Sequence, residues 1–139
     1  MSSNTKSIGV AYTDQEINGS DVILSDRELG YTAAAQGAVT QLTSKSTAVT
    51  LNKSAGRVTM NNAALAGNTA VSFVLNNSLI SANDIIILNI SGGAVADPTA
   101  YTTYISGMGT GTVTITLRNL TVTSQSEAVI INFALIHCA

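Results

Sequence analysis

Apolar residues alternate with threonine, serine and asparagine through most of this chain, and the alternation is most regular over residues 111–118. There Val113, Ile115 and Leu117 share one side of an extended chain, while threonines and Arg118 occupy the other. A period of two residues is typical of a strand with one face on a core, because successive side chains of a strand point to opposite faces. The pattern therefore predicts strands in preference to helices.

Eight segments have this character, and turn-forming sequences such as Asn61-Asn62 and Asp97-Pro98 separate them. The predicted strands are 38–43, 47–52, 56–60, 69–76, 84–91, 100–106, 111–118 and 128–137. The one helix candidate is the short stretch 62–66, which Gly67 ends. Short, regularly spaced strands predict an all-β fold, either an antiparallel β-sandwich or a jelly roll.

Two of the predicted strands are apolar on both faces, namely 84–90 and 128–136. Such strands are typical of central positions that are covered on both sides. We expect the cover to be a second sheet or another subunit.

The composition changes near Ala38. Residues 1–37 contain five acidic and two basic residues, whereas the remainder contains three acidic and four basic residues. No continuous strand pattern runs through the first segment. We therefore expect an extended, acidic N-terminal arm at 1–37 and a β-sandwich body at 38–139.

Charged residues make up only 10% of the chain, well below the usual value of about 25%. A surface so poor in charge predicts that copies of the chain or a partner cover much of it. Six basic residues against eight acidic ones provide no basic stripe for a phosphate backbone, so nucleic-acid binding is not expected.

Targeting signals are not apparent either. The longest apolar runs, 85–88 and 128–131, are far shorter than the roughly 20 residues of a membrane helix, and the polar N-terminus does not resemble a signal peptide. A single cysteine excludes an intramolecular disulfide, which fits synthesis in a reducing cytoplasm. We expect no membrane partner.

Chemistry-bearing residues are few. His137 is the one histidine and Cys138 the one cysteine; we expect a strand-end histidine at a subunit contact and a small apolar cysteine, with an intermolecular disulfide or a reactive thiol as the alternative for Cys138. Neither residue belongs to a catalytic motif. The sequence therefore predicts no catalytic site, no bound cofactor and no enzyme.

The acidic arm contains two pairs of carboxylates with the same spacing, Asp14 with Glu16 and Asp26 with Glu28. Neither pair follows a calcium-loop motif, so we expect a solvated or partner-facing arm, with metal binding as the weaker alternative. No metal site is predicted.

The remaining candidates favour structural roles. The glycines at 107, 109 and 111 predict a flexible hairpin, because no helix and no Lys-Ser/Thr pair follows them as in a phosphate loop. Tyr101 and Tyr104 are three apart and are expected on opposite faces, which does not suit a carbohydrate platform. Lys45 and Lys53 lie beside turns, where we expect them to be solvated.

Four segments have a distinctive sequence, namely 39–53, with its Thr-Ser-Lys-Ser-Thr run, 56–61, 71–73 and 127–134. Through these segments the chain resembles a family of structural modules from tailed bacteriophages. The likeness covers about residues 38–139 and leaves the arm unmatched. In this family such modules resemble capsid decoration and head-fibre proteins, and similar modules end longer fibre chains.

The resemblance implies a non-enzymatic virion structural protein that is made in the host cytoplasm and lies on the capsid surface. We expect it to decorate and reinforce the capsid by binding the major capsid protein and to self-associate, preferably as a homotrimer. The larger apolar residues of the arm are the expected capsid contacts: Ile8, Val10, Tyr12 and Leu29. The alternative is a tail or fibre knob involved in host-surface recognition.

Overall fold

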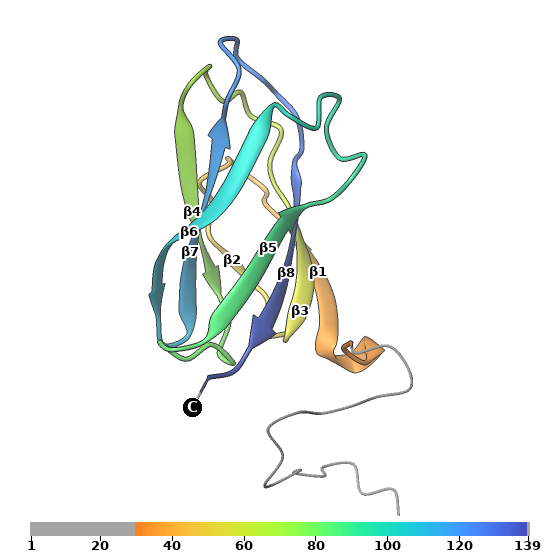
Figure 1. The fold of residues 1–139 in the computed structure, drawn as a ribbon, viewed down its shortest axis with the longest axis vertical. Coiled ribbons are helices and arrows are strands. Elements are labelled where there is room, and N and C mark those ends of the chain that lie inside the picture. The colour runs from red at the N-terminus through yellow and green to blue at the C-terminus, as the bar shows by residue number, and fades with distance from the viewer. Residues whose placement is uncertain (1–29, 139) are drawn as a thin grey trace, which may run out of the picture. The chain divides into compact units, whose positions relative to one another are not determined.

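The computed structural model describes residues 30–138, which form two packed β-sheets (Figure 1). The elements, in chain order, are η1 (Ala33–Ala35), β1 (Gln36–Thr40), β2 (Val49–Thr50), β3 (Ala55–Thr59), β4 (Ala70–Asn76), β5 (Ile85–Ile90), β6 (Tyr101–Gly109), β7 (Thr112–Asn119) and β8 (Ile130–Ile136). The first sheet has the strand order β1-β3-β8-β5 and the second has the order β2-β4-β7-β6. The predicted all-β sandwich is confirmed.

Both sheets are mixed. The pairs β1–β3 and β2–β4 are parallel, whereas the other four pairs are antiparallel. The cause is the path of the chain, since β1 and β3 lie in one sheet while β2 and β4 lie in the other. Because the chain crosses to the opposite sheet between them, it re-enters each sheet in its original direction. A parallel pair requires such a crossover.

Each predicted strand corresponds to an observed one, although the segment expected at 47–52 contains only the short β2. The helix expected at 62–66 is wrong. Leu65 instead forms an isolated bridge with Gln125, through two backbone hydrogen bonds of 2.8 and 3.0 Å. A stretch this short gains few helical hydrogen bonds, and here the bridge to a distant loop prevails.

The compact unit that contains the sandwich begins at Tyr31. Gln36 and Gly37 already pair with β3 at Ala55 and Gly56. The Tyr31 hydroxyl also donates a hydrogen bond to the Leu135 carbonyl at the end of β8. The segment 31–37, which composition alone assigned to the arm, therefore contributes to the sandwich.

The core lies between the sheets and follows the predicted alternation. In β7 the inward side chains of Val113, Ile115 and Leu117 are fully buried, and Phe73 and Leu75 of β4 lie beside them. The first sheet contributes Val58 from β3 and three alternate residues of β8, which are Ile131, Phe133 and Leu135. Two half-buried sheets thus form one continuous apolar layer.

The expectation of two central strands is only half correct. β8 lies between β3 and β5, but β5 is the edge strand of its sheet. Its outward residues Ile85 and Ile87 each remain 54% exposed. The apolar outer face of this strand therefore has no cover within the described part of the chain.

The hairpin predicted from the three glycines joins β6 to β7. Its tip is Thr110-Gly111, and Gly111 adopts a left-handed backbone with φ of 76°, which glycine tolerates readily. The N–H of Gly111 donates to Ile80, and its carbonyl accepts from Asn77. Gly107 lies inside β6, where the register with β7 shifts after Ile105. The tip is thus fixed to the neighbouring loop.

One close approach in the first sheet depends on glycine. A Cβ at Gly56 would lie 2.7 Å from Leu51 Cδ2 and 2.8 Å from Phe133 Cε1. We expect Gly56→Ala to lower the free energy of unfolding by about 1–3 kcal/mol through overpacking. Urea unfolding measures the effect, and Gly92→Ala, which meets no atom within 4 Å, is the control. Equal stabilities of the two variants would contradict the packing argument.

Candidate functional site

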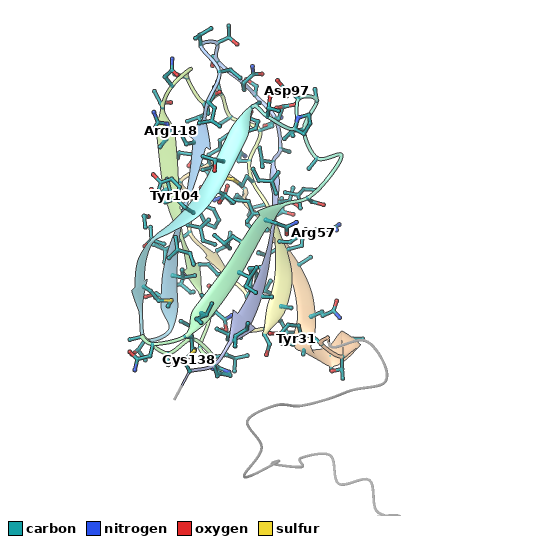
Figure 2. The ribbon with its side chains drawn as sticks, in the orientation of Figure 1. Tyr31, Arg57, Asp97, Tyr104, Arg118 and Cys138 are labelled. Carbon is teal, nitrogen blue, oxygen red and sulfur yellow. The ribbon has the colours of Figure 1, made fainter. Side chains whose placement is uncertain are left out.

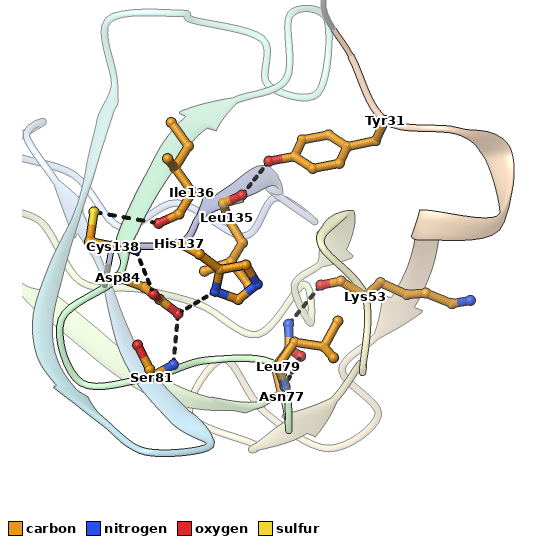
Figure 3. Close-up of polar contacts among 10 residues, drawn as sticks. All are labelled: Tyr31, Lys53, Asn77, Leu79, Ser81, Asp84, Leu135, Ile136, His137 and Cys138. Atoms are coloured by element: carbon orange, nitrogen blue, oxygen red, sulfur yellow. Dashed lines mark hydrogen bonds and ion pairs between the residues drawn. The ribbon is translucent and has the colours of Figure 1, made fainter. Parts of the chain in front are cut away.

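A group of ionisable residues, Asp84, His137 and Cys138, lies just before β5 and after β8 (Figure 3). The carboxylate is buried and accepts three hydrogen bonds. The backbone N–H of Ser81 donates to Oδ2 at 2.7 Å, and the backbone N–H of Cys138 donates to Oδ1 at 3.1 Å. His137 Nδ1 lies 3.1 Å from Oδ2. Asp84 thus joins the loop before β5 to the residues that follow β8.

These donors stabilise the charged form of the carboxyl group. The pKa of Asp84 is lowered from 3.8 to about 2, chiefly because the Ser81 backbone N–H donates to the carboxylate, although burial opposes the shift. The hydrogen bonds with Cys138 and His137 are smaller contributions to the same shift. At neutral pH, Asp84 is therefore a buried anion with its oxygens satisfied by the fold.

His137 and Cys138 do not form a nucleophile and base pair in this arrangement. The side chain of His137 is 63% exposed, and its contact is with Asp84. The Cys138 sulfur points toward the Ile136 carbonyl at 3.9 Å (Figure 3). Nucleophilic catalysis needs the base within hydrogen-bond reach of the nucleophile, so the geometry supports a structural role in holding the end of β8.

The prediction for Lys45 is wrong, because its side chain is buried with only 3% exposed. Its Nζ donates to the carbonyl of Asn61 at 2.5 Å and to the carbonyl of Glu127 at 2.6 Å. Burial lowers the pKa of the Lys45 ammonium, and the negative charge of Glu127 opposes that shift. Lys53 is half-buried and donates to the Ala34 carbonyl at 2.7 Å. Both lysines bind backbone instead of extending into water.

Three further buried polar side chains, which were not predicted from the sequence, hold loops. Gln41 donates to the carbonyls of Lys45 and Thr47. Asn119 donates to the carbonyls of Leu65, Ala66 and Thr123. Asn77 donates to Lys53 and accepts from Leu79 (Figure 3). The spacing along the chain could have predicted their burial. Each one lies two residues after the last inward-facing apolar residue of its strand.

The two tyrosines face opposite ways, as predicted. Tyr101 is buried, and burial together with the nearby carboxylate of Glu127 raises its pKa to about 12. Its hydroxyl has no hydrogen-bond partner among residues 30–138. Tyr104 is 47% exposed on the outer face of the second sheet, which Figure 2 shows alongside Arg118. One exposed ring does not make an aromatic platform.

The outer face of the second sheet is a row of hydroxyl groups. Ser72, Thr116 and Tyr104 share one register line across β4, β7 and β6. The Thr116 hydroxyl lies 2.8 Å from that of Ser72 and donates to that of Ser106 at 2.7 Å. The hydroxyl groups of Ser72, Thr116 and Ser106 thus bond to one another, and this part of the face is polar without being charged.

The outer face of the first sheet has a shallow trough of about 420 Å³ over β1, β3 and β8. Small residues form its floor, including Ala38 and Ala55, and Arg57 and Asn132 stand at its side. Arg57 Nε donates weakly to Asn132 Oδ1 at 3.4 Å. The trough is open and holds no group suited to acid–base chemistry.

Several predicted residues lie outside the described range. They include the expected capsid contacts Ile8, Val10, Tyr12 and Leu29, and the carboxylate pairs of the arm. Within residues 30–138, no group of three or more His, Cys, Asp or Glu side chains is arranged to hold a metal ion. The same residues contain no helix that is long and apolar enough to cross a membrane.

Comparisons with protein-family models, with curated proteins and with solved structures find no match to this chain. Functional inference therefore depends on the residues and on their arrangement in the sandwich.

The two hydrogen bonds from Lys45 to backbone carbonyls should contribute to stability. We expect Lys45→Met to lower the free energy of unfolding by about 1–3 kcal/mol, because two buried carbonyls lose their donor. Urea unfolding at pH 7 measures the change. Lys53→Met, which removes one more exposed hydrogen bond, is the matched control and should cost less. A Lys45→Met variant as stable as the natural chain would contradict the assignment.

The low pKa of Asp84 predicts that its contribution to stability depends on pH. Because the pKa of Asp84 is about 2 in the fold and near 3.8 otherwise, its stabilising effect is complete above pH 4 and is lost as the pH falls through 2. We expect Asp84→Asn to melt at a lower temperature at pH 5, with the difference shrinking toward pH 2. Calorimetric melts across this range measure it. A difference independent of pH would exclude an ionised Asp84.

Proposed function

We propose that this chain is a non-enzymatic structural protein of a virion, which decorates a phage capsid and reinforces it. The observation that carries the proposal is the surface of the sandwich. Its outward faces consist mainly of small or uncharged residues, among them threonine, serine, asparagine, alanine and isoleucine, and the described strands place only Arg57 and Arg118 among the charged residues on those faces. Surfaces of this kind suit burial against other subunits.

The interior of the sandwich suits a mechanical role. Buried polar side chains fix the loops, and the buried ionisable groups Asp84 and Lys45 are satisfied by backbone. Rigid loops lose little conformational entropy when they bind a partner, which strengthens association. Asp84 and Lys45 are thus engaged in holding the fold, which supports a non-enzymatic function.

Reinforcement follows from binding alone. A protein that binds the closed shell in preference to its separated subunits stabilises the shell by mass action. Contacts with the major capsid protein across joints between capsomers would have to break before the shell opens. We propose a homotrimer as the bound form, because three-fold positions on a capsid match a three-fold partner.

We propose that the N-terminal arm makes the attachment to the capsid, through Ile8, Val10, Tyr12 and Leu29. The described compact unit begins at Tyr31, so the sandwich and the arm can be separated by truncation. The arm contains most of the acidic residues of the chain. Its apolar residues would provide the buried area and its acids the polar rim.

We expect a chain that begins at Gly30 to keep its β-type circular dichroism but to lose binding to undecorated capsids. The full-length variant with Ile8, Val10 and Tyr12 replaced by serine should bind more weakly by several kcal/mol, at about 1.5–3 kcal/mol for each fully buried side chain. Cosedimentation with capsids measures binding. The control is the full-length Asp14→Asn variant, which changes the arm but keeps Ile8, Val10 and Tyr12.

If the truncated chain still saturates capsids, the arm is not the attachment device. If the full-length chain binds purified tails but not capsids, the alternative of a tail or fibre knob for host-surface recognition replaces capsid decoration. Tyr104 (Figure 2), together with the neighbouring hydroxyl groups of Thr116 and Ser106, is then the first surface to test for receptor contact.

A further inference from the structure

The outer face of the first sheet has an apolar patch at one end, formed by Ile85, Ile87, Ala134 and Ile136, which we call the isoleucine patch. Register places these residues side by side, with Ile85 opposite Ile136 and Ile87 opposite Ala134. The three isoleucines are 54%, 54% and 46% exposed. They are neighbours on one face, so they form a continuous surface and are not scattered apolar residues.

The patch has no charge. Asn89 and Asn132 form the next register line, and Arg57 lies beyond them at the position paired with Asn132. Arg57 is the one charged residue on the outward positions of β1, β3, β8 and β5. The two uncharged amides of Asn89 and Asn132 thus lie between the isoleucines and Arg57 on this face.

We propose that the isoleucine patch is the surface through which copies of this chain associate, with the patches facing one another about the symmetry axis. In a closed symmetric assembly, a residue near the axis meets its own copies. A charged residue there would face a like charge and oppose association. The isoleucine patch avoids this repulsion because it contains no charged residue. A partner of different sequence could supply an opposite charge and so would not require an uncharged patch.

The backbone of β5 supports the same partner. Ser91 N–H donates to the Ile130 carbonyl, so in the antiparallel ladder the odd-numbered residues of β5 bond to β8, while Ile86, Leu88 and Ile90 direct their N–H and C=O groups to the open edge. Exposed edges usually have lysine, proline or a bulge that blocks further pairing. β5 has none of these, and a neighbouring copy would cover it.

This inference names the contact surface of the oligomer in the proposed function, and so it rests on that function in part. The two are tested separately, because the experiment on the patch uses the purified full-length chain without capsids.

Light scattering coupled to size exclusion measures the oligomer. We expect the natural chain to be oligomeric at micromolar concentration. Ile87→Asp should weaken association by at least about 100-fold, because like charges meet at the axis. Val122→Asp is the matched control: Val122 is 85% exposed but lies between β7 and β8, outside the patch. It should leave the oligomer intact. Circular dichroism melts confirm that both variants are folded.

A charge exchange distinguishes self-contact from other arrangements. Ile87→Lys alone should also be monomeric, whereas an equimolar mixture of Ile87→Asp and Ile87→Lys should recover an oligomer that salt weakens. A natural chain that is monomeric at 100 μM, or an Ile87→Asp variant that keeps the oligomer, overturns the inference. So does a mixture that stays monomeric, because the patch would then face a different surface. Capsid binding by a monomeric natural chain would overturn this inference and leave the proposed function standing.

Discussion

The structure depends on satisfying the backbone of its loops, because a sandwich with short strands leaves many N–H and C=O groups without a ladder partner. An unpaired backbone group away from water costs about as much as a lost hydrogen bond. This chain meets the requirement with a few buried polar side chains. Asn119 alone donates to three carbonyls and accepts from Thr121, and Lys45 joins two loops that are distant in sequence.

The same requirement explains why Asp84 is poorly suited to act as a general acid or base. Asp84 receives its hydrogen bonds from the two chain segments that it joins, and these bonds hold its pKa near 2. A general acid or base needs a pKa close to the working pH and a free position for substrate. The carboxylate of Asp84 thus fixes the loop before β5 to the residues that follow β8.

Those two faces differ in a way that matters for assembly. On the second sheet, Ser72, Thr116 and Ser106 bond to one another, so the face satisfies itself and presents few unmet groups. On the first sheet, Ile85, Ile87 and Ile136 remain exposed beside an open strand edge. One outward face is therefore polar with its hydroxyl groups bonded to one another, and the other has an exposed apolar end.

The sequence by itself determined the strands and the core, because a period of two residues assigns each side chain to a face wherever one face is buried. The same spacing also indicates four buried polar residues at strand ends. Gln41, Asn77, Asp84 and Asn119 lie in register with the inward-facing residues of β1, β4, β5 and β7. Only the tertiary structure decided that Lys45 is buried, that β5 is an edge strand and that each sheet has a parallel pair. These features depend on which segments meet across long separations, and local periodicity does not encode strand order or the partner of a loop.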